Sequence, residues 1–111
     1  MQVYEKSADP AYFCGHWNGS PVEIGDGKHV SIPEGEVLHH HPYYEYYVVL
    51  EGQAELEVDG KVVKMEAGQV IMVEPGENHK VISISPEGAR WIIVKERSEP
   101  DSKVIPGVDA V

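Results

Sequence analysis

The chain is poor in cysteine, with Cys14 as the single example among 111 residues, so no intramolecular disulfide can form. A lone thiol agrees with a reducing compartment. The N-terminal residues lack the basic start and the apolar stretch of a signal peptide. No apolar run approaches the roughly 18 residues that would indicate a membrane span. We therefore expect a cytoplasmic protein without a membrane partner.

Basic residues are also scarce: nine lysines and arginines stand against nineteen acids, which gives a formal net charge of −10. Nucleic-acid binding depends on Lys and Arg to neutralise phosphates, and the chain has no basic cluster. We therefore expect no nucleic-acid partner. The simplest interpretation of the acidity is solubility, and the alternative is an acidic face that receives a cationic partner.

A helical periodicity is missing as well, because no window repeats its apolar residues about every 3.6 positions. Short β-rich runs broken by Gly and Pro are typical of an all-β sandwich or barrel. The predicted strands are Lys28–Ile32, Glu45–Leu50, Ala54–Val58, Lys61–Glu66, Gln69–Val73, His79–Ile84 and Arg90–Lys95. Asp59 and Gly60 between two of these strands predict a type I′ hairpin turn, and Pro33–Gly35 predicts a break.

The length suits a single domain, since domains commonly have about 100–150 residues. We expect one domain over residues 1–111, with a barrel core at about 28–96, an N-terminal arm at 1–27 and a C-terminal tail at 97–111. Within the arm, Tyr12–Trp17 is a candidate strand. The polar tail, punctuated by Pro and Gly, either packs along the body or a neighbour, or is mobile.

Two of the predicted strands are apolar on both faces. Every residue after the first in Gln69–Val73 is apolar, as are the four central residues of Arg90–Lys95. A strand with one buried face should alternate apolar with polar residues, so these strands predict cover on their second face as well. In so small a chain another subunit is a suitable cover, and we predict a homodimer with C2 symmetry. Cover by the chain's own terminal arms is the alternative.

Three of the six histidines fall into a pattern with one acid. His39 and His41 point to the same side of an extended strand because side chains alternate with period two, and Glu45 keeps that parity. Nitrogen and oxygen donors that converge from one face are what a divalent transition metal requires. His79 joins them if a small antiparallel barrel closes, since residues distant in sequence then face one interior.

These residues and the glycines around them resemble the two sequence motifs of the cupin superfamily. The matching positions are His39, His41, Glu45 and Gly52 in the first motif, and Gly68, Gly76 and His79 in the second. The resemblance covers roughly residues 28–96. The chain departs from the motifs at turn and outer positions, where Glu74 replaces a proline, Pro33 a glycine and Ser83 an asparagine.

The resemblance implies a cupin-type double-stranded β-helix, a jelly-roll barrel of about six to eight strands with a metal inside its wider mouth. It implies that His39, His41, Glu45 and His79 are the ligands of one divalent transition metal per chain. Imidazole suits Zn, Cu, Fe and Ni, and a carboxylate adds affinity for Mn or Fe. Four protein donors leave positions of a six-coordinate ion open, and one carboxylate balances only part of its charge.

The remaining histidines are weaker candidates. His40 has the parity opposite to that of the proposed ligands, so we expect it to face outwards or to make an outer contact. A shift of register would instead make His40 a ligand. His16 and His29 carry no spacing signal, although His29 could lie near the mouth of the barrel.

Tyr43 and Tyr47 share the parity of the ligands and are candidates to line the cavity, while Tyr47 suits core packing equally well. Tyr43 and Glu45 are the candidate catalytic residues, with Glu45 acting as a base if it detaches from the metal. Arg90 either binds a substrate carboxylate or pairs with a surface acid.

Three functions remain open on this sequence. The first is a metal-dependent enzyme that binds a small oxygen-rich organic substrate and carries out a dioxygenase-like oxidation. The second is a metal-assisted isomerase, epimerase or lyase acting on a sugar or hydroxy acid. The third is a non-catalytic protein that binds a small ligand. A hydrolase with a Gly-x-Ser-x-Gly motif is excluded, because that motif is absent.

Overall fold

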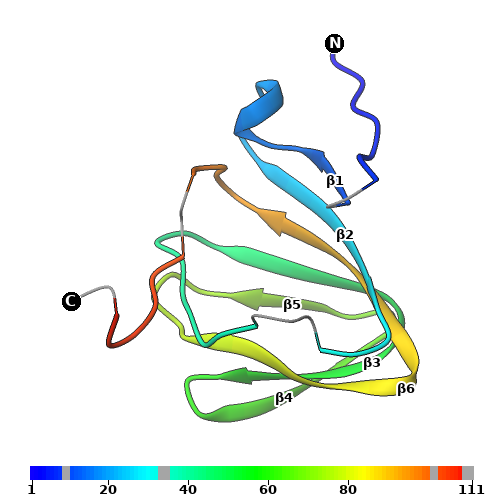
Figure 1. Ribbon diagram of the computed structural model, residues 1–111, viewed down its shortest axis with the longest axis vertical. Coiled ribbons are helices and arrows are strands. Elements are labelled where there is room, and N and C mark those ends of the chain that lie inside the picture. Colours follow the sequence, from blue (N-terminus) through cyan, green and yellow to red (C-terminus); the bar gives the residue numbers. More distant parts are fainter. Residues whose placement is uncertain (9–10, 33–35, 101–102, 109–111) are drawn as a thin grey trace.

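Two long antiparallel strands, β3 (Glu45–Val58) and β6 (His79–Lys95), form the centre of the fold (Figure 1). The other elements are the strands β1 (Tyr12–Cys14), β2 (Glu23–His29), β4 (Lys61–Glu66) and β5 (Val70–Val73), and the 3-10 helix η1 (His16–Asn18). The computed structural model describes residues 1–8, 11–32, 36–100 and 103–108. The predicted break at Pro33–Gly35 lies outside these residues.

The two long strands bend together, and this bend closes the barrel. As a straight strand, the 17 residues of β6 would span about 56 Å, which exceeds the 39 Å of the longest dimension of the molecule. The first half of β3 pairs with β5, and its second half pairs with β4. β2 pairs with the second half of β6, and β1 pairs with β2. Each long strand therefore contributes to both walls of an all-β jelly roll, as predicted.

Glycines mark the bend. The β3–β6 register shifts between Val49 and Glu51 and again between Gly52 and Ala54. Gly52 has a φ of +72°, and a Cβ at this position would overlap the carbonyl oxygen of Gly88 on the neighbouring strand. A bulge of this kind bends a strand without ending its pairing. The prediction of separate strands before and after residues 51–53 and 85–89 is therefore wrong: the chain continues through both glycines as two bent strands.

The tight turn between β3 and β4 confirms the hairpin prediction. Asp59 has a φ of +47° and Gly60 a φ of +81°, so both central residues adopt the left-handed backbone that a type I′ turn requires. The Asp59 carboxylate also accepts a hydrogen bond from the backbone N–H of Asn78, at 2.9 Å. The turn is thereby tied to the residue that precedes β6.

The strand predicted at Lys28–Ile32 is wrong in its position. The observed strand, β2, begins five residues earlier and ends at His29, and it pairs with β6 along its whole length. Its two glycines, Gly25 and Gly27, interrupt the pattern of β-forming residues, so the sequence alone does not indicate a strand here. A Cβ at Gly25 would meet the ring of Tyr12, and a Cβ at Gly27 would meet the ring of His29. Glycine stands in this strand because other side chains pack closely over it.

The N-terminal candidate strand is shorter than predicted, since Tyr12–Cys14 forms β1 and the chain then turns into η1. In the described part of the C-terminal tail, Val104 contacts the body of its own chain, in agreement with one of the outcomes anticipated for the tail. Val104 and His40 exchange two backbone hydrogen bonds, of 2.8 and 3.0 Å. Within the part of the chain that the structure describes, no helix has the length and apolar character needed to cross a membrane.

The inner face of the barrel carries the hydrophobic core, with residues from β3, β4, β5 and β6. Leu56 and Met65 are fully buried, and Trp91 is nearly so. The buried members of the core cluster are Tyr47, Val49, Ala54, Leu56, Met65, Val73, Val81, Ala89 and Trp91. The cluster extends from Leu56 and Met65 to Val73, which is the ladder partner of Glu45, so the buried polar side chains of the inner face lie directly beside the apolar core.

An apolar surface lies on the outer side of the sheet formed by β5, β3 and β6. We call it the outer apolar patch, and its residues are Val70, Met72, Tyr46, Val48, Ile92 and Val94, which are ladder partners across the three strands. Val70 is 60% exposed and Met72 is 47% exposed. The doubly apolar strands predicted from the sequence therefore exist, and the terminal arms leave these two side chains open to solvent.

The close crossing of Gly52 and Gly88 can be tested with a pair of alanine variants. We expect Gly52→Ala to lower the free energy of unfolding by about 3 kcal/mol, because left-handed strain of about 1–2 kcal/mol adds to overpacking of about 1–3 kcal/mol. Gly60→Ala has the same strain, but nothing lies within 4 Å of the new Cβ. Chemical denaturation should show a loss of only about 1 kcal/mol for this control. Equal losses in the two variants would contradict the crossing.

Candidate metal centre

The side chains from His39 to Tyr47 alternate between the interior and the surface, as predicted. His39, His41 and Glu45 are 5%, 3% and 3% exposed, while the side chains between them are exposed or half-buried. His39 and His41 lie in an extended segment before β3 rather than within a regular strand. His39 is fixed by a two-hydrogen-bond bridge to His79, with N···O distances of 3.1 and 2.8 Å.

The fold brings all four predicted ligands together. Glu45 is the first residue of β3 and His79 is the first residue of β6, and in the β3–β6 ladder they lie at opposite ends. The bend at Gly52 brings the two ends of the ladder together, so His79 Nε2 lies 2.9 Å from Glu45 Oε1. His41 Nε2 lies 3.7 Å from the other carboxylate oxygen of Glu45. One ligand atom from each of the four residues falls within 4.8 Å of the others.

Backbone carbonyls fix the orientation of two imidazoles. His39 Nδ1 donates to the carbonyl oxygen of Val37 at 2.8 Å, and His79 Nδ1 donates to that of Glu77 at 2.9 Å. A carbonyl oxygen can only accept, so in each ring the hydrogen sits on Nδ1 and Nε2 is the atom available to a metal. Such outer hydrogen bonds are a regular feature of metal-binding histidines.

The electrostatics of the cluster favour neutral imidazole at His39. Burial lowers the pKa of His39 to about 4, with the neighbouring His79 and His41 contributing in the same direction. Burial also lowers the pKa of His79, but its hydrogen bond to Glu45 and the charge of that carboxylate outweigh burial, so the pKa of His79 is raised. Burial would raise the pKa of Glu45, whereas the His79 hydrogen bond and the His41 charge hold it low. The opposite shifts, raised at His79 and lowered at Glu45, favour an ion pair between these two side chains.

This donor set fits a divalent transition metal. Donors bonded to one ion at about 2.1 Å lie at most about 4.2 Å apart, so the observed 4.8 Å spread requires only a small contraction. An ion would take the place of the proton shared between His79 and Glu45. Its two charges would also compensate the buried carboxylate more completely than one proton does.

His40 confirms the prediction that it faces away from the cluster. Its Nδ1 lies 2.8 Å from Asn78 Oδ1, and its backbone pairs with the C-terminal tail. His29 lies against Trp91, with ring centroids 4.8 Å apart. His16 is exposed and lies 2.9 Å from the hydroxyl of Ser98. Among the described residues, the metal-type cluster contains none of these three histidines.

Tyr43 and Tyr47 both point inwards and are 2% and 4% exposed. The Tyr43 ring stacks on His41 with centroids 5.1 Å apart and an interplanar angle of 11°, and its hydroxyl lies 3.4 Å from His41 Nδ1. Tyr47 belongs to the core cluster and contacts His79 edge-on, with centroids 6.3 Å apart. The tyrosines therefore support ligand rings, and catalytic roles for Tyr43 and Glu45 remain predictions.

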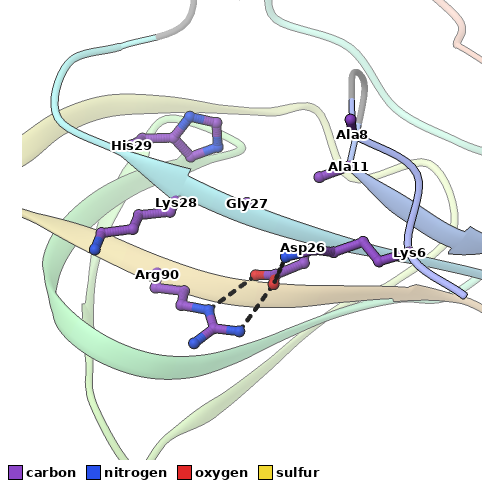
Figure 2. A pocket seen from close by; sticks show the side chains of 8 residues that line it. All are labelled: Lys6, Ala8, Ala11, Asp26, Gly27, Lys28, His29 and Arg90. Atoms are coloured by element: carbon purple, nitrogen blue, oxygen red, sulfur yellow. Dashed lines mark hydrogen bonds and ion pairs between the residues drawn. The ribbon is translucent and has the colours of Figure 1, made fainter.

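Arg90 lies away from the metal-type cluster, on the outer face of β6. Its Nε and Nη2 donate to the two carboxylate oxygens of Asp26 at 3.0 and 2.8 Å, and Lys6 reaches the same carboxylate at 3.2 Å (Figure 2). The Arg90 hydrogen bonds hold the pKa of Asp26 below its usual range. These residues line an outer groove of about 600 Å³. Of the two roles predicted for Arg90, the pairing with an acid is the one observed.

Two charged residues beside the cluster were missed at the sequence level. Lys95 is the ladder partner of Glu45 on one side and of Glu23 on the other, so the three side chains share the inner face. Lys95 Nζ lies 3.0 Å from Glu23 Oε2. Lys95 has the same parity in its strand as the buried Trp91, and this parity predicts that Lys95 faces the interior. Glu23 offered none, because its strand was predicted five residues too late.

Comparison with known proteins gives the family. The family model described as "Cupin domain" matches residues 28–95. The chain belongs to the cupin family. A cupin protein from Bacteroides fragilis is similar over 100% of this chain and 98% of its own, with 19% identity and a TM-score of 0.61. An RmlC-like cupin with a double-stranded β-helix fold from Methanocaldococcus jannaschii is similar over 87% and 91%, with 14% identity and a TM-score of 0.66.

Other similar proteins carry names with an activity. A structure of oxalate decarboxylase has a TM-score of 0.69 and 13% identity, covering 92% of this cupin and 30% of that chain. The polyketide synthase CurC of Streptomyces cyaneus is 34% identical over 55 residues, which are 49% of this cupin and 36% of the relative. This cupin thus matches about a third of that relative's length. The structural similarities establish the fold, the cupin double-stranded β-helix.

The ligand assignment predicts different results for two adjacent histidines. We expect the wild-type protein, purified without added metal, to contain close to one transition-metal ion per chain. His41→Ala should lose most of this ion, because a direct ligand contributes more than the roughly 10–100-fold in affinity that an outer hydrogen-bond partner contributes. His40→Ala is the matched control and should retain it. Elemental analysis measures both, and metal retained in His41→Ala but lost in His40→Ala would establish the alternative register.

Proposed function

We propose that this cupin is a metal-dependent enzyme that acts on a small oxygen-rich organic substrate by a dioxygenase-like oxidation. The observation that carries the proposal is the set of three imidazoles and one carboxylate, all buried, with donor atoms within 4.8 Å of one another. When bound, a redox-active divalent ion supplies Lewis acidity and open positions for a chelating substrate and O2.

The chain's own residues have separable tasks in this proposal. His39, His79 and His41 present nitrogen donors, and Glu45 supplies the single negative charge among the ligands. The carbonyl oxygens of Val37 and Glu77 hold two of the rings in the orientation that leaves Nε2 available. Tyr43 stacks on the third ring, and Arg97 lies over the Tyr43 ring at 5.3 Å from its centroid. Each of the three rings thus has a contact that favours its orientation towards the cluster.

A second candidate reaction uses the same residues. In a metal-assisted isomerase, epimerase or lyase, the ion acts only as a Lewis acid. Glu45 supports this candidate, because a carboxylate that detaches from the ion can act as a general base. The oxalate decarboxylase structure described above has this fold as well. The third candidate, a non-catalytic small-ligand protein, needs only the pocket.

Oxygen consumption separates the first candidate from the other two. The Fe(II)-loaded protein should take up O2 in the presence of one class of substrate in a panel of small organic acids, diketones and phenols. His79→Ala should abolish this uptake, because it removes both a ligand and the partner of Glu45. No uptake across the panel by a protein that holds one iron per chain would contradict the dioxygenase proposal and favour the Lewis-acid reaction.

We also propose that the protein is a homodimer joined through the outer apolar patch. The patch carries no charged side chain, although the chain has a net charge of −10. Two copies with the same strong charge attract each other best through an uncharged face, and a C2 axis matches such a face to itself. With Val70 and Met72 already exposed, burial against a second copy would remove apolar surface from water.

Met72→Lys tests this arrangement. The variant should shift the protein from twice the chain mass to the chain mass in analytical ultracentrifugation, because the interface would have to bury an unpaired ammonium group. Val62→Lys is the control, since Val62 is similarly exposed, at 58%, but lies on β4 outside the patch. A wild-type monomer, or a dimer that survives Met72→Lys, would contradict the proposal.

A further inference from the structure

Three ionisable side chains form a row across the inner face of the barrel. Glu23 on β2, Lys95 on β6 and Glu45 on β3 are successive ladder partners. Lys95 Nζ lies 3.0 Å from Glu23 Oε2, and the two side chains are only 13% and 10% exposed. Glu45, the third member, is the proposed metal ligand. A buried lysine therefore sits between the metal centre and a second carboxylate.

Glu23 is anchored in turn, so the position of Lys95 is defined. The hydroxyl of Ser98 donates to Glu23 Oε1 at 2.9 Å, which occupies the carboxylate oxygen that does not face the lysine. Ser98 also accepts a hydrogen bond from the backbone N–H of His16 at 2.7 Å. Ser98, which follows β6, and His16 of η1 thus hold Glu23. Because these contacts fix Glu23, the ion pair between Glu23 and Lys95 has a defined position on the inner face.

Lys95 has more hydrogen-bonding capacity than its neighbours use. An ammonium group carries three N–H donors, and Glu23 is the only described residue with which Lys95 forms a hydrogen bond or ion pair. Burial alone would lower the pKa of Lys95, but the charge of Glu45 and the hydrogen bond to Glu23 outweigh burial and raise it. Lys95 thus stays charged and has N–H donors available for a ligand.

A small hollow lies along β2 and β6, the two strands that carry Glu23 and Lys95. It has a volume of about 190 Å³ and is lined by Ala11, Tyr12, Gly25, Asp26, Gly27, His29 and Ile93. Gly25 and Ile93 form the second ladder pair along the strands from Glu23 and Lys95, and the first on the same side of the sheet. The volume corresponds to about six water molecules at about 30 Å³ each, which suits a compact organic molecule rather than a polymer.

We propose that Lys95, held by Glu23, binds an anionic group of the substrate beside the metal ligands, which makes the substrate class small organic acids. The inference rests on the metal-dependent function proposed above. A bound ion takes up the charge of Glu45, and Glu23 balances Lys95, so the interior keeps a net positive charge. A carboxylate that reaches this interior meets both a Lewis acid and a charged hydrogen-bond donor.

Two probes of equal shape test the role of charge. Glycolate and its uncharged isostere glycolamide are titrated into the Co(II)-loaded protein, and the visible absorption bands of cobalt report binding. Lys95→Met should weaken glycolate binding by about tenfold to a hundredfold, because a hydrogen bond to a charged group contributes about 1.5–3 kcal/mol. The affinity for glycolamide should change less than twofold. Lys64→Met, at an exposed ion pair on β4, should alter neither affinity.

The outcomes separate the inference from the function on which it rests. Lys95→Met that keeps one cobalt per chain and binds glycolate like the wild type would overturn the role of Lys95 and leave the metal centre intact. Equal losses for both probes would overturn it too, since they would indicate a structural ion pair. A wild type that binds no cobalt would overturn the proposed function and the inference together. If Lys95→Met does not fold, Lys95→Gln keeps a donor for Glu23 without the charge and should show the same selective loss.

Discussion

The bend in the β3–β6 ribbon is the constraint on which the site depends. Without it, Glu45 and His79 would stand at opposite ends of a ladder, because Glu45 pairs with Lys95 and His79 pairs with Val58. Glycine at position 52 lets β3 lie very close to the backbone of Gly88 on β6. The two strands bend together at this point, so the two ends of their ladder come together. A side-chain distance of 2.9 Å between Glu45 and His79 is therefore a consequence of backbone geometry some seven residues away from Glu45.

Once the ribbon is bent, burial and charge determine the chemistry of its open end. The apolar core extends from Leu56 and Met65 to Tyr47 and Val73, and the buried polar groups lie beside it, at the start of β3 and at the start of β6. An unpaired carboxylate would be costly there, and Glu45 is compensated by its hydrogen bond to His79. On the neighbouring strand, the charge of Lys95 is likewise compensated, by the carboxylate of Glu23. Charge inside this barrel is arranged in pairs, and each pair has donors or acceptors left for a ligand.

The sequence was sufficient to predict the interior positions of His39, His41 and Glu45, since period-two alternation holds through this segment even where no regular strand forms. His79 required the resemblance to the cupin motifs, because no local pattern places it near the others. The bent strands were not predictable, since a glycine that ends a strand and a glycine that bends one have the same local sequence. Glu23 and Lys95 depend on the register between β2 and β6, which is a tertiary property hidden by Gly25 and Gly27.

The metal centre can be tested by a crystal structure of the protein as purified, with anomalous data collected at transition-metal absorption edges. We expect one anomalous peak per chain, about 2.0–2.2 Å from Nε2 of His39, His41 and His79 and from a carboxylate oxygen of Glu45. A peak bound through Nδ1 of any of these rings, a peak at His40, or a fully ordered cluster without a peak in metal-supplemented crystals would contradict this prediction.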